Sequence, residues 1–178
     1  LSRVKPVQFG HFAIVYAGIL YPPKRVITPV MKAIRRLNAN LNGGAGRCYF
    51  HYYGRHQEHV VEGAKGAGVS EQVVPHGQVP TAEALAAVKG AGAAVVITTV
   101  LDEASKQEQG IVTGKIFEAV GLGAPILLIC PSGSDAESVV RETGLGRAFR
   151  GSDVDGVVEF LRDLMSGSAV RSENIAAY

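Results

Sequence analysis

The hydrophobic and polar positions of this chain follow two alternating periods. Short runs of β-branched and apolar residues predict strands at 12–17, 47–53, 71–76, 93–98, 124–130 and 146–150. The stretches between them are longer and amphipathic, and predict helices near 26–41, 56–67, 81–90, 112–122, 134–143 and 153–166. Strands that alternate with helices form parallel βαβ units. We therefore expect a doubly wound α/β fold, a Rossmann-like parallel sheet of about six strands with helices on both faces.

Residues that favour the ends of helices stand between the predicted elements. Thr81 opens one predicted helix, and Ser-Asp pairs open "SDAESVV" and "SDVDGVVEF", where their side-chain oxygens are expected to cap the first turn. The stretch "NGGAG" at 42–46 separates a helix from a strand, which favours a C-terminal cap and turn. It does not follow a strand and open a helix, so a dinucleotide-binding fingerprint is not indicated.

Length and charge narrow the class of protein. With 178 residues the chain is expected to form one domain. The net charge of +2 is too small to favour nucleic-acid binding, and the basic cluster "KAIRR" has the spacing of a solvated helix face. Cys48 and Cys130 lie far apart, outside any CxxC motif, which favours free thiols and a cytoplasmic location.

The sequence contains no apolar run near the roughly 20 residues of a membrane-spanning helix. The N-terminal stretch also lacks the apolar centre of a signal peptide. A peripheral contact with the inner face of the membrane stays open.

The segment "GIVTGKIFEAVGLGAPILLIC" at 110–130 carries the most informative polar residues. Ligands of parallel sheets bind outside the carboxyl ends of the strands, where helix N-termini present free N–H groups. Thr113 and Gly114 stand at such a predicted helix start, and Lys115 adds a positive charge that is unfavourable there unless an anion binds. Glu118 lies on the same helix face and is able to accept hydrogen bonds from two ribose hydroxyls. An exposed Lys115–Glu118 ion pair of small stabilising effect is the alternative.

Other polar groups of the sequence favour structural interpretations. Ile116, Phe117 and Val120 are expected to form the apolar stripe of the same helix against the sheet. The spacing of His51, His56 and His59 does not provide a convincing third ligand for a metal ion. We therefore expect these histidines to be partly exposed, with Arg55 or His56 lining the ligand cleft. The side chains of Ser132, Ser134 and Asp135 are interpreted as helix caps because no G-x-S-x-G motif accompanies them.

Three segments together resemble a known family. The C-terminal stretch "GKIFEAVGLGAPILLICPSGSDAESVVRETGLGRAF" resembles the donor-nucleotide half of GT-B-fold glycosyltransferases, especially the large group that uses nucleoside-diphosphate sugars in cell-envelope assembly. The opening "FAIVYAGILYPPKR" is similar to the first strand of that half, and "VVPHGQVPTAEALAAVKGAGAAVVIT" to its middle. The resemblance covers about 12–166. It implies the C-terminal half of a GT-B fold, with 1–178 as a single donor-nucleotide-binding domain and the N-terminal acceptor domain absent from this chain.

The resemblance also implies roles for individual residues. Glu118 matches the glutamate that holds the donor ribose, Lys24 matches the lysine that neutralises the diphosphate, and Gly18 matches the glycine that lets the first loop pass close to the ligand. Gln78 and Val79 fall in the turn that meets the base.

Two positions depart from the pattern. Ile19 replaces an arginine, so we expect Arg25 or Lys115 to supply one phosphate contact. Gly110 replaces a glutamate that touches the sugar, and Glu108 and Gln109 are near enough in sequence to substitute for it.

The function implied is transfer of a sugar from a nucleoside diphosphate, UDP among the candidates, to an acceptor in polysaccharide or glycoconjugate biosynthesis. No metal or other cofactor is expected, and this chain alone is expected to bind the donor without catalysing transfer. Its expected partners are the nucleotide sugar and an N-terminal acceptor-binding domain. The alternatives are a nucleotide-sugar epimerase of similar fold and a non-catalytic domain that has lost donor binding.

Overall fold

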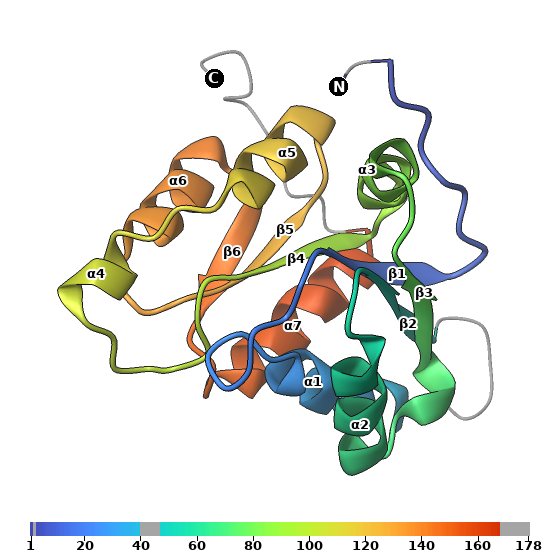
Figure 1. The fold of residues 1–178 in the computed structure, drawn as a ribbon, viewed down its shortest axis with the longest axis horizontal. Helices are drawn as coiled ribbons and strands as arrows, with labels where there is room; N and C mark the ends of the chain where they lie inside the picture. Colours follow the sequence, from blue (N-terminus) through green and yellow to red (C-terminus); the bar gives the residue numbers. More distant parts are fainter. Residues whose placement is uncertain (2, 40–46, 168–178) are drawn as a thin grey trace.

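A computed structural model describes residues 1, 3–39 and 47–167 and contains one parallel sheet (Figure 1). Its strand order is β3-β2-β1-β4-β5-β6, and every neighbouring pair runs parallel. The strands are β1 (Phe12–Ala17), β2 (Cys48–Tyr53), β3 (Val73–Gly77), β4 (Ala93–Ile97), β5 (Ile126–Ile129) and β6 (Gly146–Phe149). The predicted doubly wound sheet is thereby confirmed.

Helices cover both faces of the sheet (Figure 1). One face packs against α1 (Thr28–Ala39), α2 (Gln57–Ala67) and α7 (Val154–Met165). The other packs against α3 (Thr81–Gly90), α5 (Gly114–Leu122) and α6 (Asp135–Thr143). A four-residue helix, α4 (Lys106–Gln109), lies in the long loop after β4, and the 3-10 turn η1 (Ser70–Gln72) precedes β3.

The apolar side chains form two cores, one on each side of the sheet. Successive side chains of a strand point to opposite faces, so Ile14 and Tyr16 belong to one core and Ala13 and Val15 to the other. The central strands β4 and β5 are buried along their whole length. This explains why both are apolar at every position, as strands covered on two sides are expected to be.

Most predicted helix ends agree with the structure, and one is wrong. Ser134 and Asp153 cap α6 and α7 by accepting hydrogen bonds from the N–H groups of Glu137 and Gly156. Thr81 is not a cap: the N-cap of α3 is Pro80, which places Thr81 in the first turn. The "NGGAG" stretch at 42–46 lies outside the described residues.

The structure also shows where β3 begins and what state the two cysteines are in. The strand predicted from residue 71 begins at Val73, because Glu71 and Gln72 form the 3-10 turn. Cys48 and Cys130 are free and buried.

The strand order reverses between β1 and β4. From β1 the chain moves to β2 and β3 on one side, then returns to β4 and continues to β5 and β6 on the other. The loops after β1 and β4 therefore leave the sheet in opposite directions and open a crevice at the carboxyl ends of these strands, the usual ligand position in such folds.

Candidate functional site

The first turn of α5 faces this crevice without a side-chain cap. Thr113 is the N-cap residue, but its hydroxyl accepts no hydrogen bond from the helix. Its Oγ1 is buried and has no partner among the described residues. The free N–H groups of the first turn carry the positive end of the helix dipole, so this terminus is suited to an anion.

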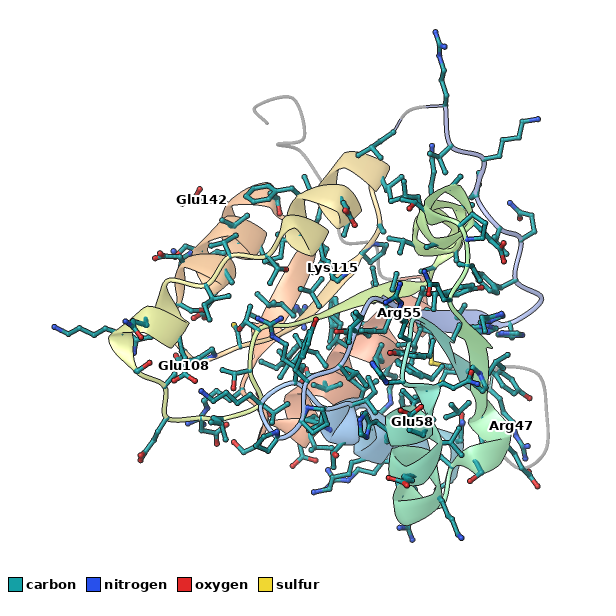
Figure 2. All side chains as sticks on the ribbon, viewed as in Figure 1. Arg47, Arg55, Glu58, Glu108, Lys115 and Glu142 are labelled. Carbon is teal, nitrogen blue, oxygen red and sulfur yellow. The ribbon has the colours of Figure 1, made fainter. Side chains whose placement is uncertain are left out.

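Lys115, the second residue of α5, lies directly against Gly18 at the end of β1. A Cβ atom built on Gly18 would be 2.4 Å from Lys115 Cε and 2.6 Å from its Nζ, and the φ of Gly18 is 149°. Only glycine fits here. Figure 2 shows Lys115 on α5 with Arg55, which follows β2, and Glu108 on α4.

No salt bridge joins Lys115 to Glu118 in the described part of the chain. The alternative of an exposed ion pair between them is therefore wrong. Glu118 is exposed, and both residues line the same small hollow between α5 and the sheet. The Lys115 ammonium thus lies beside a helix N-terminus without a described carboxylate partner.

Close backbone contacts fix the loops after β1, β2 and β3 against one another. The Gly18 N–H donates to Tyr53 O at 2.8 Å, and the Gly54 N–H donates to Gly77 O at 2.8 Å. A Cβ atom on Gly54 would lie 1.9 Å from Gly18 O. The glycines at these strand ends therefore allow three main-chain segments to meet at the edge of the crevice.

A second group of residues surrounds a cavity of about 530 Å³ next to the crevice. Lys24 Nζ lies 2.7 Å from Glu108 Oε1, and Arg25 Nε donates to Thr98 O at 3.1 Å. The Thr98 side chain is buried, and its Oγ1 lacks a partner among the described residues. Two cations and an unused hydroxyl thus border one cavity, which is suited to a phosphate or a sugar hydroxyl.

Glu108 is held in its ionised form. The Lys24 ammonium and the hydrogen bonds from Ser105 lower the pKa of Glu108 to about 2. Ser105 donates from both its N–H and its hydroxyl to Glu108 Oε2, which completes the capping box of α4. Glu108 therefore joins the loop after β4 to Lys24 in the loop after β1.

The outer strands add one more polar pair. Arg55 Nε donates to Gln78 Oε1 at 2.7 Å. Both side chains are exposed at the carboxyl ends of β2 and β3, while Val79 packs against the core on the α3 side. The expectation that Arg55 borders the cleft is consistent with this position.

Two sequence-based expectations near the site are wrong. Phe117 is 50% exposed, whereas Ile116 and Val120 are buried as expected, because Phe117 falls on the outer side of α5. His51 is 5% exposed, not partly exposed, because it occupies an interior position of β2. Thr98 and Tyr21 were not predicted, although both border the cavity. Thr98 follows the apolar strand β4 directly, and that position was the available signal.

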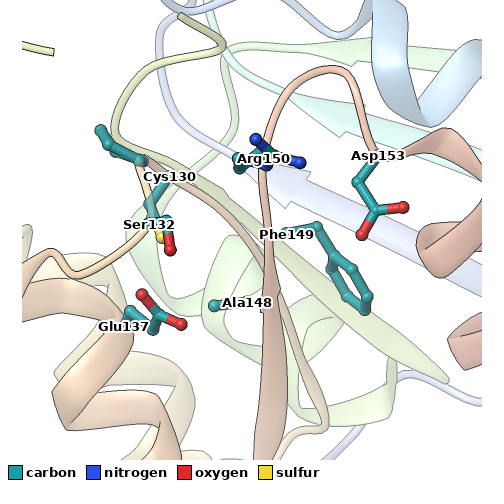
Figure 3. Close-up of a pocket in the computed structure, with 8 residues that line it drawn as sticks. Cys130, Ser132, Glu137, Ala148, Phe149, Arg150 and Asp153 are labelled. Atoms are coloured by element: carbon teal, nitrogen blue, oxygen red, sulfur yellow. The ribbon is translucent and has the colours of Figure 1, made fainter. Parts of the chain in front are cut away.

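A hollow of about 180 Å³ lies at the ends of β5 and β6 (Figure 3). Its two acids have structural roles: Glu137 accepts a hydrogen bond from the Gly133 N–H, and Asp153 caps α7. Ser134 caps α6, which confirms the capping interpretation for that residue. No histidine lines this hollow, so Ser132 has no base beside it there.

Within residues 1, 3–39 and 47–167, no group of three or more His, Cys, Asp or Glu side chains is arranged to hold a metal ion. Over those ranges, none of the helices combines the length and apolar character needed to cross a membrane.

Comparison with known proteins shows the fold. No family model matches the sequence, and no curated protein matches it by sequence. Among solved structures, the galactosyltransferase WaaB of the lipopolysaccharide outer core shares 18% identity at a TM-score of 0.60, covering 93% of this chain and 43% of WaaB. Anabaena Alr3699/HepE in complex with UDP-glucose shares 12% sequence identity at a TM-score of 0.65, and the match covers 94% of this chain and 42% of HepE. A Listeria monocytogenes structure assigned to UDP-N-acetylglucosamine 2-epimerase shares 14% identity at a TM-score of 0.57, and the match covers 90% of this chain and 38% of that protein.

This chain spans less than half the length of each of these proteins. At identities this low, the likeness establishes a shared Rossmann-like fold. It leaves the chemistry to the site itself.

Proposed function

We propose that this chain is the donor-nucleotide-binding domain of a glycosyltransferase that uses a nucleoside-diphosphate sugar, with UDP as the first candidate nucleotide. The observation that carries the proposal is the α5 N-terminus, where Thr113 leaves the first turn uncapped and Lys115 lies against Gly18 at the switch point. A bound diphosphate supplies the negative charge that this arrangement lacks. UDP-glucose in the similar HepE structure supports the choice of nucleotide.

The remaining predicted residues have roles consistent with their positions. The N–H groups of Thr113 and Gly114, together with Lys115, bind one phosphate group. Lys24 and Arg25 neutralise the other. Glu118 accepts hydrogen bonds from the ribose hydroxyls, and the turn of Gln78 and Val79 meets the base.

Transfer breaks the bond between the anomeric carbon and the diphosphate. Fixed positive groups stabilise the negative charge that develops on the leaving diphosphate. With these cations in place the proposed chemistry does not require a metal.

Lys24 must exchange partners when the donor binds. The Lys24 side chain is 57% exposed and that of Glu108 16%, so the ammonium is open to an incoming phosphate while Ser105 keeps its hydrogen bonds to Glu108. A phosphate oxygen replaces the carboxylate because it forms an equally charge-assisted hydrogen bond with the ammonium. The released Glu108 is then free to accept hydrogen bonds from the sugar, the role left open by Gly110.

Calorimetric titration with nucleotides tests the proposal. We expect UDP to bind at least roughly tenfold more tightly than UMP, because each charged hydrogen bond to the second phosphate contributes about 1.5–3 kcal/mol. Glu118→Ala should weaken UDP binding by a similar free energy and leave the unfolding free energy nearly unchanged. Glu159→Ala, an exposed glutamate of α7 on the opposite face, is the matched control. Equal affinities for UDP and UMP would contradict the assignment of the phosphate site.

The whole protein is proposed to place an acceptor-binding domain opposite this one, and 1–178 to form the donor domain alone. We further propose a cytoplasmic protein of cell-envelope or polysaccharide synthesis, with any membrane contact peripheral and made by the longer protein. Incubating that protein with UDP-sugars separates the candidates. Sugar transfer supports a glycosyltransferase, a changed sugar without transfer supports an epimerase, and neither supports a domain that has lost donor binding.

A further inference from the structure

Three histidines form a hydrogen-bonded chain that joins the segment before β1 to β2 and β3. His11 Nε2 lies 2.8 Å from His51 Nε2, and His51 Nδ1 lies 2.9 Å from His76 Nε2. His11 belongs to the segment that precedes β1, His51 to β2 and His76 to β3. The central ring, His51, is buried, and both of its nitrogen atoms are engaged.

Aromatic rings contact all three imidazoles, of which His51 is buried and His11 and His76 are exposed. Phe9 contacts the His51 ring at a centroid distance of 4.7 Å, and Tyr49 contacts His11 at 4.5 Å. On the other side, Tyr53 stacks on His76 at 4.0 Å with the ring planes 3° apart. The rings hold the three imidazoles in place and keep water from the central one.

The segment that carries His11 crosses one side of the domain and touches three elements. The Val7 N–H donates to Ala86 O of α3 at 2.9 Å. Leu1 lies against α5, since a Cβ on Gly121 would be 2.6 Å from Leu1 Cδ1. The third attachment is the hydrogen bond between His11 and His51 on β2, and Val4, Val7 and Phe9 of the same segment also pack against the core on the α3 side of the sheet.

The hydrogen-bonding capacity of the imidazole nitrogens limits how many protons the histidine chain can bind. Each N···N contact needs one hydrogen between its two nitrogens, and a neutral imidazole carries one N–H. Three neutral rings satisfy both contacts when all donate in the same direction. One extra proton is also accommodated, because a cationic ring donates from both nitrogens. A second extra proton places two N–H groups face to face in one contact, so that contact must break.

We propose that His11, His51 and His76 form a proton-sensitive clasp, which holds the segment of residues 3–11 on the sheet near neutral pH and releases it in acid.

The surroundings of the clasp set the direction of the effect. Burial, followed by the neighbouring His76 and His11, lowers the pKa of His51 to about 4. Burial also lowers the pKa of His76, against which Glu83 of α3 acts in the opposite direction. Tyr49 and Tyr53 of β2 and His11 of the segment are the other titratable groups in contact with these rings.

Because the clasped state disfavours the charged imidazole, its stabilising effect is complete above about pH 6.5. It is lost progressively as the pH falls from 6.5 towards 4. This inference does not depend on the proposed function.

Native-state hydrogen exchange tests the clasp, with a chelator present throughout so that metal binding does not contribute. After correction for intrinsic exchange, the Val7 amide should lose protection roughly 10- to 100-fold between pH 7.5 and pH 4.5, the effect expected when release lets one further histidine of ordinary pKa, about 6.5, take up the proton that the clasped state excludes. The Val95 amide of β4 should stay protected over the same range, because the core does not open. Equal protection of Val7 at both pH values would overturn the proposal.

Three variants separate the clasp from a general effect of acid. His11→Gln supplies an amide that is able to accept from or donate to His51, so Val7 should stay protected at pH 4.5. His51→Phe removes the link, so Val7 should exchange rapidly at both pH values. His59→Gln, an exposed histidine of α2, is the control and should behave like the unchanged protein. If His51→Phe does not fold, His11→Gln alone decides, and acid release of Val7 in that variant as in the control overturns the clasp.

Discussion

Lys115→Met should weaken nucleotide binding without weakening the fold. The substitution keeps an unbranched stem of similar length beside Gly18 and removes only the ammonium group. In the structure that ammonium lies at the start of α5, and none of the described carboxylates forms a salt bridge with it. Binding and stability are therefore expected to change independently.

The position of the Lys115 ammonium determines the expected size of both changes, in UDP affinity and in the free energy of unfolding. A charged hydrogen bond to phosphate contributes about 1.5–3 kcal/mol, so the Kd for UDP should rise by roughly 10- to 150-fold. A positive charge near a helix N-terminus costs about 0.3–1 kcal/mol. Because no described ion pair is lost, the unfolding free energy should stay the same or increase by up to about 1 kcal/mol.

Calorimetry with UDP and urea unfolding measure the two quantities on the same preparation. Lys32→Met, on the exposed side of α1, is the matched control and should change neither. A Lys115→Met protein that binds UDP normally would refute the phosphate contact. A variant that loses stability together with binding would show that Lys115 supports the loop after β1 and that its charge is not what binds the nucleotide.

Three further outcomes are expected. Gly54→Ala should lower the unfolding free energy by about 1–3 kcal/mol in urea unfolding, because its Cβ would lie 1.9 Å from Gly18 O. Glu108→Gln should make thermal stability fall less steeply between pH 4.5 and pH 2 than in the unchanged protein. The pKa of Glu108 is lowered to about 2, so the stabilising contribution of its carboxylate is complete above pH 4.5 and is lost as the pH falls through 2. This chain alone should hydrolyse a donor slowly and transfer no sugar in a product assay, since positioning an acceptor supplies up to roughly 7–11 kcal/mol of the barrier; efficient transfer by the monomer would contradict this.

The fold was predictable because its strongest signals are local. The runs in β4 and β5 are apolar at every position, which only strands covered on both faces require, and Ser134 and Asp153 mark helix starts by their own chemistry. The helix α4 was missed because its four residues carry no apolar period. The spacing of Ser105 and Glu108 is nevertheless a capping-box signal that the sequence contains.

The candidate site was predictable in its position more than in its contacts. In a parallel sheet all carboxyl ends share one edge, so the loops holding Gly18 and Lys115 lie at the edge where ligands are expected. The pairing of Lys24 with Glu108 depends on the shapes of two loops, and no period in the sequence encodes those shapes. Thr98 was missed for a related reason, since a threonine after a strand is ordinary until burial leaves its hydroxyl without a partner.

The histidines show how strand register determines which residues meet. In "HYYGRHQEH" the sequence groups His51 with His56 and His59, but the end of β2 separates them. His51 lies within β2, whereas His56 is the N-cap residue that precedes α2 and has a left-handed φ of 59°. The pairing of β2 with β3 shifts between Tyr52 and Tyr53, opposite Pro75 and Gly77, so His76 is an extra residue at the bulge. Because a bulge re-aims the side chain it carries, the contact between His76 and His51 depends on a single inserted position. Alternation along either strand alone predicts which residues share a face, but not which of them touch across strands.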